Sequence, residues 1–342
     1  MARASPSRPG RALVAILVIG IGLASAPAAF QMFTRAPKGG RMIEQFRPYM
    51  TTAKIGRFQG YLGEIGRADA EAQERLAPVV SSRLGLSPAA ADTRFAEVAQ
   101  LRQRWPGIDA DMSDMLAKMQ RNIGKFKGVD ALPPFVLFPW FFVLPGLLAA
   151  ALAAWALAAR RRGGTPRRRV RALALLGVAL IAAPAVFQMF SRAPGGARMI
   201  DDFEPLMTTR KVTTVQGYFL VLGAAEGQLR TEVLPALASG PAGSATSSAQ
   251  FPALGAFSRD WPRISNEMAP MIGTMADNVD NYAAVRALPP FWLFPWFFVL
   301  PGLLIMGLAI ETSRTMPGAL RPATAEVPAR RNEDALVERS VR

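Results

Sequence analysis

Apolar and polar segments alternate along this chain twice, in the same order. Four stretches are apolar throughout and contain no charged residue, namely 12–33, 135–159, 172–190 and 291–310. About 20 apolar residues in a helix cross the roughly 30 Å hydrocarbon core of a bilayer, so the pattern predicts four transmembrane helices. Four buried helices of a soluble core are disfavoured because core helices are usually shorter and amphipathic. Cleavage of the first stretch as a signal peptide is disfavoured because Pro27 would follow the cut.

Part of the sequence occurs twice. Residues 30–37 return at 187–194 with one conservative change, and residues 131–146 return at 287–302 with Val136 replaced by tryptophan. The first pair lies 157 positions apart and the second pair 156 positions apart. This duplication predicts two tandem repeats, related by an approximate twofold axis along the membrane normal.

The sequence therefore predicts an all-α integral membrane protein with four transmembrane helices in two tandem repeats, each with an extracytoplasmic helical-bundle domain. We expect the two helical domains to pack side by side. The expected order is a cytoplasmic N-terminus (1–11), repeat 1 (12–159, outer domain 35–134), an Arg-rich cytoplasmic link (160–171), repeat 2 (172–310, outer domain 192–290) and a disordered cytoplasmic tail (311–342).

Charge predicts the orientation of these segments. The first eleven residues hold three arginines and the link 160–171 holds seven, and neither segment contains an acid. Positive charge beside transmembrane helices stays in the cytoplasm, so both termini and the link are expected there, with the large loops outside. The net charge of +15 lies mostly beside the membrane helices, which favours lipid headgroups over nucleic acid as its partner. The excess of Arg over Lys and the abundant Ala are typical of a bacterial protein, so we expect a bacterial plasma membrane.

The polar segments are predicted to be helical. Residues 108–126 place Ile, Met, Asn and Phe at alternating spacings of four and three, and residues 264–282 repeat this stripe. Heptad spacing of this kind predicts a helix with one apolar face. The Trp-Pro pairs at 105–106 and 261–262 are expected to start these helices, because proline is favoured in the first turn.

Proline followed by glycine marks the expected breaks. Pro37 and Pro194 precede glycine pairs and predict the end of the first membrane helix of each repeat. Two further Pro-Gly pairs lie within the returning membrane helices and predict a kink in each. The functional interpretation of these kinks is a hinge or a substrate-lining break, as in transporters, and the favoured interpretation is a bend made by packing. The kink residues are Pro145, Gly146, Pro301 and Gly302.

Three sets of residues are candidate sites. Asn122 and Asn278 lie on the apolar stripes, where a buried amide fixes register or pairs with a partner helix. The methionines of the stripes are expected to be core, although thioethers also bind Cu(I). The candidate copper ligands under this alternative are Met112, Met115, Met119, Met268, Met271 and Met275. The arginines at the expected outer interface are candidates for binding lipid phosphate or another anion, against the simpler role of interfacial anchoring. They are Arg35, Arg41, Arg192 and Arg198.

Composition excludes several kinds of chemistry. The chain contains no Cys and no His, which excludes disulfides and thiol chemistry and disfavours zinc, haem and His-based catalysis. No phosphate-binding loop or paired-carboxylate pattern is present, and the four apolar stretches hold no ionisable relay. We therefore expect a non-enzymatic envelope protein without a cofactor. Its outer domains would bind a partner protein, lipid or wall component, and a homo-oligomer is compatible with this sequence. The alternatives are a small-solute transporter or channel subunit, and a Met-based copper handler.

Overall fold

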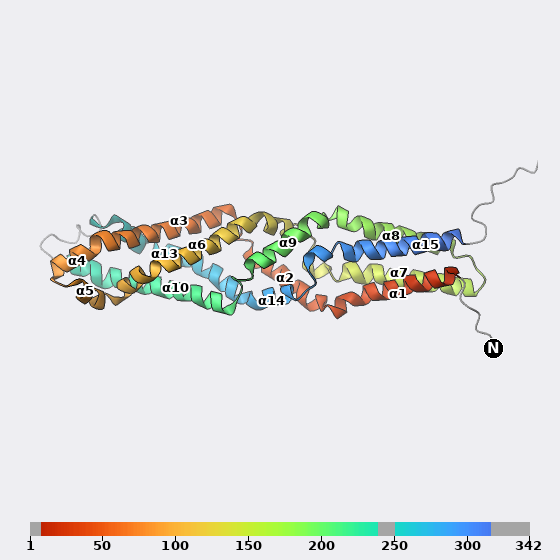
Figure 1. Ribbon diagram of the computed structural model, residues 1–342, viewed down its shortest axis with the longest axis horizontal. Helices are drawn as coiled ribbons and strands as arrows, with labels where there is room; N and C mark the ends of the chain where they lie inside the picture. The colour runs from red at the N-terminus through yellow and green to blue at the C-terminus, as the bar shows by residue number, and fades with distance from the viewer. Residues whose placement is uncertain (1–7, 239–249, 316–342) are drawn as a thin grey trace, which may run out of the picture.

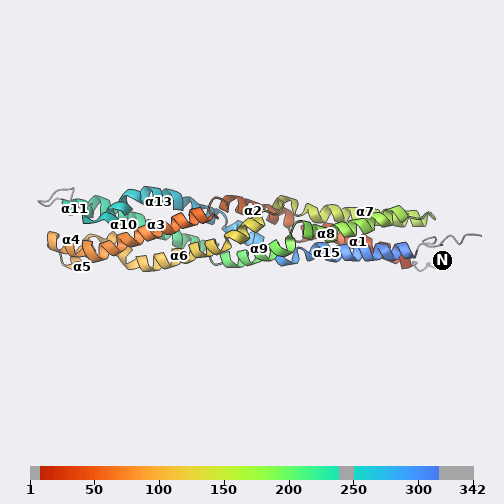
Figure 2. The ribbon, with the colours of Figure 1, turned by 90° about the horizontal axis from the view of Figure 1, so that it is seen from above.

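The computed structural model describes residues 8–238 and 250–315, and every regular element in these residues is a helix. The helices form a long rod, with four apolar helices at one end and a second group of long helices at the other (Figures 1 and 2). The shorter elements are η1 (Ala72–Leu76), α4 (Ala77–Leu84), α5 (Pro88–Arg94), η2 (Phe135–Leu137), η3 (Leu229–Val233), α11 (Leu234–Ala238), α14 (Val279–Arg286) and η4 (Phe291–Leu293).

Four helices make up the span bundle at one end of the rod. They are α1 (Arg8–Ala29), α7 (Trp140–Arg161), α8 (Arg167–Val186) and α15 (Trp296–Arg314). Together with the residues that lead into α7 and α15, all four are long and apolar enough to cross a membrane. Among the described residues, every exposed large hydrophobic side chain except Leu220 lies in these helices or directly beside them. Such a surface suits lipid rather than water, so the predicted all-helical chain with four candidate spans is confirmed.

Glycine allows the spans to pack closely in pairs. Helix α1 packs along α7, and α8 packs along α15. A Cβ atom added at Gly20 would lie 2.7 Å from the carbonyl oxygen of Gly146, and one added at Gly177 would lie 2.7 Å from that of Gly302. Two of the four residues predicted at kinks, Gly146 and Gly302, are therefore the contact points between paired spans. This is the packing role that small residues have in membrane helix pairs.

Phenylalanine rings fill the centre between the two pairs of spans. The rings of Phe142 and Phe298 have centroids 4.7 Å apart, and those of Phe138 and Phe294 are 6.0 Å apart. In each pair the two rings hold corresponding positions in the two halves of the chain. The middle of the bundle at this level is thus a packed apolar core.

The helices that leave the spans begin at an unusual backbone conformation. Gln31 and Gln188 precede α2 (Met32–Phe46) and α9 (Met189–Phe203), with φ angles of 54° and 53°. This left-handed region is costly for residues other than glycine, and it turns the chain between α1 and α2 and between α8 and α9.

The predicted helix breaks at Pro37 and Pro194 are wrong, because α2 and α9 continue through both prolines. The glycines that follow these prolines are contact points rather than breaks. A Cβ atom at Gly39 would lie 3.1 Å from Val285, and one at Gly196 would lie 3.1 Å from Val129. Small residues here let α14 and α6 approach the helices closely.

The distal bundle consists of four long helices from both halves of the chain. They are α3 (Thr52–Glu71), α6 (Ala96–Asp130), α10 (Thr209–Gln228) and α13 (Pro252–Asp277). Each packs against two others, so that α6 contacts α3 and α10, and α13 contacts the same two helices. We expected two bundles side by side, whereas these helices form a single bundle. A pair of helices cannot cover an apolar stripe on its own, and the second pair completes its core.

Two of the long helices of the distal bundle, α6 and α13, begin earlier than predicted. Helix α6 starts at Ala96 and contains Pro106, and α13 starts at Pro252 and contains Pro262. A proline inside a helix costs about 3 kcal/mol or more because it removes a hydrogen bond and crowds the preceding turn. The turns before each proline are nevertheless retained, because Leu101 and the corresponding Phe257 are buried in the core.

Candidate functional site

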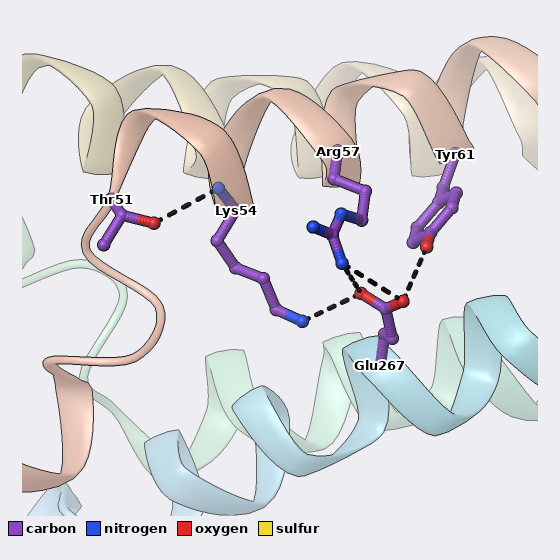
Figure 3. A network of polar contacts seen from close by, with 5 residues as sticks. All are labelled: Thr51, Lys54, Arg57, Tyr61 and Glu267. Carbon is purple, nitrogen blue, oxygen red and sulfur yellow. Dashed lines mark hydrogen bonds and ion pairs between the residues drawn. The ribbon is translucent and has the colours of Figure 1, made fainter.

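The most concentrated polar cluster in the described residues joins α3 to α13 (Figure 3). Glu267 of α13 accepts hydrogen bonds from Lys54 Nζ at 2.8 Å, Tyr61 Oη at 3.0 Å and Arg57 Nη1 at 3.2 Å. The three donors lie one turn apart on α3, because spacings of three and four residues fall on one helix face. Thr51 caps this helix, and its hydroxyl accepts from the Lys54 backbone N–H at 3.2 Å.

In this cluster the single carboxylate of Glu267 is held by two cations, Lys54 and Arg57. The hydrogen bond from Lys54, supported by the one from Tyr61, lowers the pKa of the Glu267 carboxyl to about 2. Burial and the hydrogen bond to Glu267 raise the pKa of the Tyr61 phenol. A carboxylate held in this way is a weak base and a poor nucleophile. The arrangement is therefore suited to joining helices rather than to catalysis.

A second cluster repeats this arrangement with the halves exchanged. Asp111 of α6 accepts from Lys211 Nζ and, at 2.9 Å, from Tyr218 Oη, both on α10. Burial and the hydrogen bond to Asp111 raise the pKa of Tyr218 to about 12. The cap is repeated as well, because the Thr208 hydroxyl accepts from the Lys211 backbone N–H at 3.1 Å. Sequence analysis missed both clusters, because their acids meet partners that are 100 or more residues away in the sequence and come close only in the fold.

The two asparagines of the apolar stripes are completely buried. Asn278 Nδ2 donates to Gln45 Oε1 at 2.7 Å and to the Thr274 carbonyl at 2.8 Å. Asn122 Nδ2 donates to the Lys118 carbonyl at 2.9 Å. Both amides thus sit at the bases of their bundle helices, and Asn278 reaches a side chain from the first half of the chain.

The region around Asn122 contains charged side chains, whereas the region around Asn278 is neutral. Lys125 Nζ lies 2.6 Å from Asp202 Oδ2, and the hydrogen bond from Lys125 is the main cause that lowers the pKa of Asp202. The nearby amide of Asn122 also lowers that pKa. In both places, a residue near the end of α2 or α9 contacts a helix of the distal bundle from the opposite half. The contact lies near the end of that helix that is closer to the spans.

The four candidate arginines fall into two structural classes. Arg35 Nη1 donates to the Ala287 carbonyl at 2.8 Å, and Arg192 Nη1 donates to the Ala131 carbonyl at 3.2 Å. These carbonyls end α14 and α6, where a positive charge is favourable. Arg41 and Arg198 are exposed, and the described residues offer neither of them an ion pair or hydrogen bond. Only the second class remains available to an external anion.

Arg41 lines a groove that lies between α2 and the turn that leads into η2. Its walls also carry the Arg47–Asp130 ion pair at 2.8 Å. Apolar residues complete its wall on the side of the spans, where Val136 is 55% exposed.

The six methionines of the stripes are buried in the distal bundle, each at most 3% exposed. They lie on α6 and α13 in a common apolar core, which is the expected packing role of methionine. Four other methionines line a small apolar pocket at the base of the bundle, together with Phe126 and Tyr282. These are Met42, Met50, Met199 and Met207. In the described part of the chain, no cluster of three or more acidic residues forms a metal site.

One pair of acidic residues brings two carboxyl groups close to each other. Glu64 of α3 faces Asp260 of α13, and burial followed by the charge of Asp260 raises the pKa of Glu64. Its Oε1 atom is buried without a hydrogen-bond partner among the described residues. The corresponding residues of the other half are Val221 and Arg104, so this contact exists only once.

Comparison with known proteins does not add to these observations. No protein-family model, curated protein or solved structure matches the chain. The functional argument therefore rests on the helices, their surface and the polar contacts described above.

Proposed function

We propose that this protein is a non-enzymatic membrane protein of the bacterial envelope, with a scaffold or accessory role. Its distal bundle would lie outside the plasma membrane and bind a partner protein, lipid or wall component. The observation that carries the proposal is the use of polar groups in the bundle. Glu267, Asp111 and Asp202 are all engaged in ion pairs between helices, which favours a stalk that joins helices over a catalytic site.

The tip of the rod is the favoured site for a protein or wall partner. The two halves of the chain differ most in residues 67–100 and 224–255, and the described parts of these segments, 67–100, 224–238 and 250–255, form the end of the bundle far from the spans. Residues 87–90 at the start of α5 are exposed there. A divergent, exposed tip on a matched stalk is the arrangement expected of a presented binding surface, because loops and tips tolerate change while packed helices do not.

Photocrosslinking in native membranes tests this proposal. A photoreactive residue at Ala89 on the exposed tip should capture a specific molecule from the envelope. The same residue at Tyr61, which is only 4% exposed, serves as the matched control and should capture nothing outside the chain. Deleting the distal bundle while keeping the spans should reproduce the phenotype of a full deletion. Full function of that deletion variant would reject the proposal.

The groove beside Arg41 supports lipid as a second class of partner for this protein. It combines the guanidinium group of Arg41, which is unpaired among the described residues, with the apolar surface that begins the span, which matches a phosphate above acyl chains, while Arg47 on the same wall is paired with Asp130. Arg41→Gln should lower the amount of co-purified phospholipid, measured by mass spectrometry. Arg35→Gln is the control, because Arg35 is engaged with Ala287. The transporter alternative has no comparable support, since phenylalanine rings from both halves pack the centre of the span bundle at the start of α7 and α15.

A further inference from the structure

Polar contacts between distant helices mostly join the first half of the chain to the second. Lys54 binds Glu267, Lys211 binds Asp111 and Lys125 binds Asp202, and each of these ion pairs crosses between halves. The buried amide of Asn278 also crosses, since it binds Gln45. The polar side chains of each half therefore find their partners in the other half.

Helix capping crosses between the halves in the same way. Glu71, at the end of α3, accepts from the backbone N–H groups of Ala253 and Leu254 at 2.8 and 2.9 Å. Gln228, at the end of α10, accepts from those of Glu97 and Val98 at 2.9 and 3.2 Å. The first turn of each long helix has unpaired N–H groups, and the opposite half supplies the acceptor.

In the span bundle, by contrast, each helix packs mainly against a helix of its own half. Helix α1 packs most closely against α7, and α8 against α15, with a Gly–Gly contact inside each half. Each half is therefore a two-span hairpin that is paired with itself in the span bundle. Its distal helices are completed by the other half, and only residues 162–166 join α7 to α8.

We propose that the two halves are complementary subunits fused into one chain, and that their crossing surface is sufficient to hold them together without the link. The partner that this surface fits is a two-span helical hairpin of the same design, with a lysine and tyrosine on one helix facing an acid on the partner's helix. The proposal concerns how the molecule is assembled and does not depend on the function proposed above.

The crossing surface also favours pairing of a first half with a second half. Lys125 faces Asp202 in one junction, and Gln45 faces Asn278 in the other. Two first halves would place Lys125 opposite Gln45 twice, and two second halves would place Asp202 opposite neutral amides twice. Both alternatives lose the ion pair, so the mixed pair is the stable one.

Cleavage of the full chain tests sufficiency. A protease site inserted between Gly164 and Thr165 is cut after purification in detergent, and a tag on the second half is used for recovery. We expect nearly all of the first half to be recovered with the second half. Separation of the halves after cleavage would overturn the proposal, whatever partner the protein binds.

Crosslinking of the cleaved protein tests the crossing itself. The chain has no cysteine, so Lys54→Cys with Glu267→Cys places one thiol in each half. A short bismaleimide should join the halves in this variant, since the native side chains span a longer gap than a disulfide. Lys54→Cys with Asp111→Cys is the matched control, because both thiols lie in the first half and link two copies only if first halves pair together. Equal yields of dimeric first half and mixed product would overturn the preference for mixed pairs.

Charge reversal separates recognition from general folding. Lys211→Glu should lower recovery of the cleaved first half by about tenfold, and adding Asp111→Lys should restore most of it, because Lys211 and Tyr218 are the partners of Asp111 among the described residues. The double variant keeps opposite charges at the contact with their order reversed. Failure of the second substitution to restore recovery would mean that this pair does not hold the halves together.

Discussion

At the residue scale, the spans depend on positions where a single methyl group does not fit. A Cβ atom at Gly20 would lie 2.7 Å from backbone atoms of Gly146 and Ala150. Gly22 is on the same helix, and a Cβ atom there meets nothing within 4 Å. Gly20→Ala should therefore destabilise the protein by roughly 1–3 kcal/mol, as overpacking typically does. Gly22→Ala should leave stability unchanged or slightly raised, with thermal unfolding in detergent as the measurement.

If both substitutions have the same effect, close packing of α1 on α7 is not what holds the first pair of spans together. This contrast separates the glycine contact from helix propensity, because the change in residue type is identical. In the second half, α15 offers a similar pair, namely Gly302, which contacts Gly177, and Gly307, which is open. It should behave in the same way.

Glu64 gives the protein a predicted pH dependence. Burial and the neighbouring Asp260 raise its pKa in the folded state above the unfolded value of about 4.3. Ionised Glu64 therefore destabilises the fold at pH values above the raised pKa, and this penalty disappears as the pH falls below the unfolded value. Glu64→Gln should be more stable than the natural protein at pH 7, and the difference should vanish near pH 4. Thermal unfolding across this range measures it, with the exposed Glu74→Gln as control.

Sequence spacing predicted some residue environments and missed others for physical reasons. The heptad stripe correctly predicted the buried methionines, because period and burial follow directly from helix geometry. It could not predict the left-handed backbone of Gln31 and Gln188, since glutamine has no preference for that region. The Glu267 cluster was equally hidden, because a solitary acid gives no local indication of a partner more than two hundred residues away.

At the element scale, the ends of the long helices are set by the other half of the chain. Glu71 accepts two N–H groups at the start of α13, and Gln228 does the same for α6. Glu71→Ala should destabilise the protein by about 1–3 kcal/mol, because it leaves buried donors unpaired. Glu71→Gln should retain most of the stability, as the natural glutamine at 228 indicates. Chemical unfolding in detergent compares the two, and equal losses would show that the cap contributes little.

This capping explains why helix starts were mispredicted. The Trp-Pro pairs at 105–106 and 261–262 are typical of a first turn, yet both lie about ten residues inside their helices. Local propensity indicated the later start, and the acceptors that stabilise the earlier start come from α3 and α10. The same competition explains α2, where contact with Val285 at Gly39 outweighs the tendency of Pro37 to end a helix.

At the scale of the whole molecule, the sequence is duplicated, and each half supplies contacts that complete the distal helices of the other half. Hydropathy was sufficient to predict four spans, because lipid imposes length and composition directly. The single distal bundle was not predictable in the same way. Two hairpins side by side and one shared bundle bury the same stripes, and only the pairing of side chains such as Lys54 with Glu267 distinguishes them.

The predicted orientation can be tested on the intact molecule because the chain has no cysteine. Gly163→Cys places a thiol in the arginine-rich link at one end of the rod, and Ala89→Cys places one at the other end, where the side chain is exposed. Seven arginines beside the spans should hold the link in the cytoplasm. A membrane-impermeant maleimide added to intact bacteria with a permeabilised outer layer should therefore label Ala89→Cys and spare Gly163→Cys until the inner membrane is lysed. The reverse pattern would place the distal bundle in the cytoplasm, and any partner of its tip would then have to be cytoplasmic.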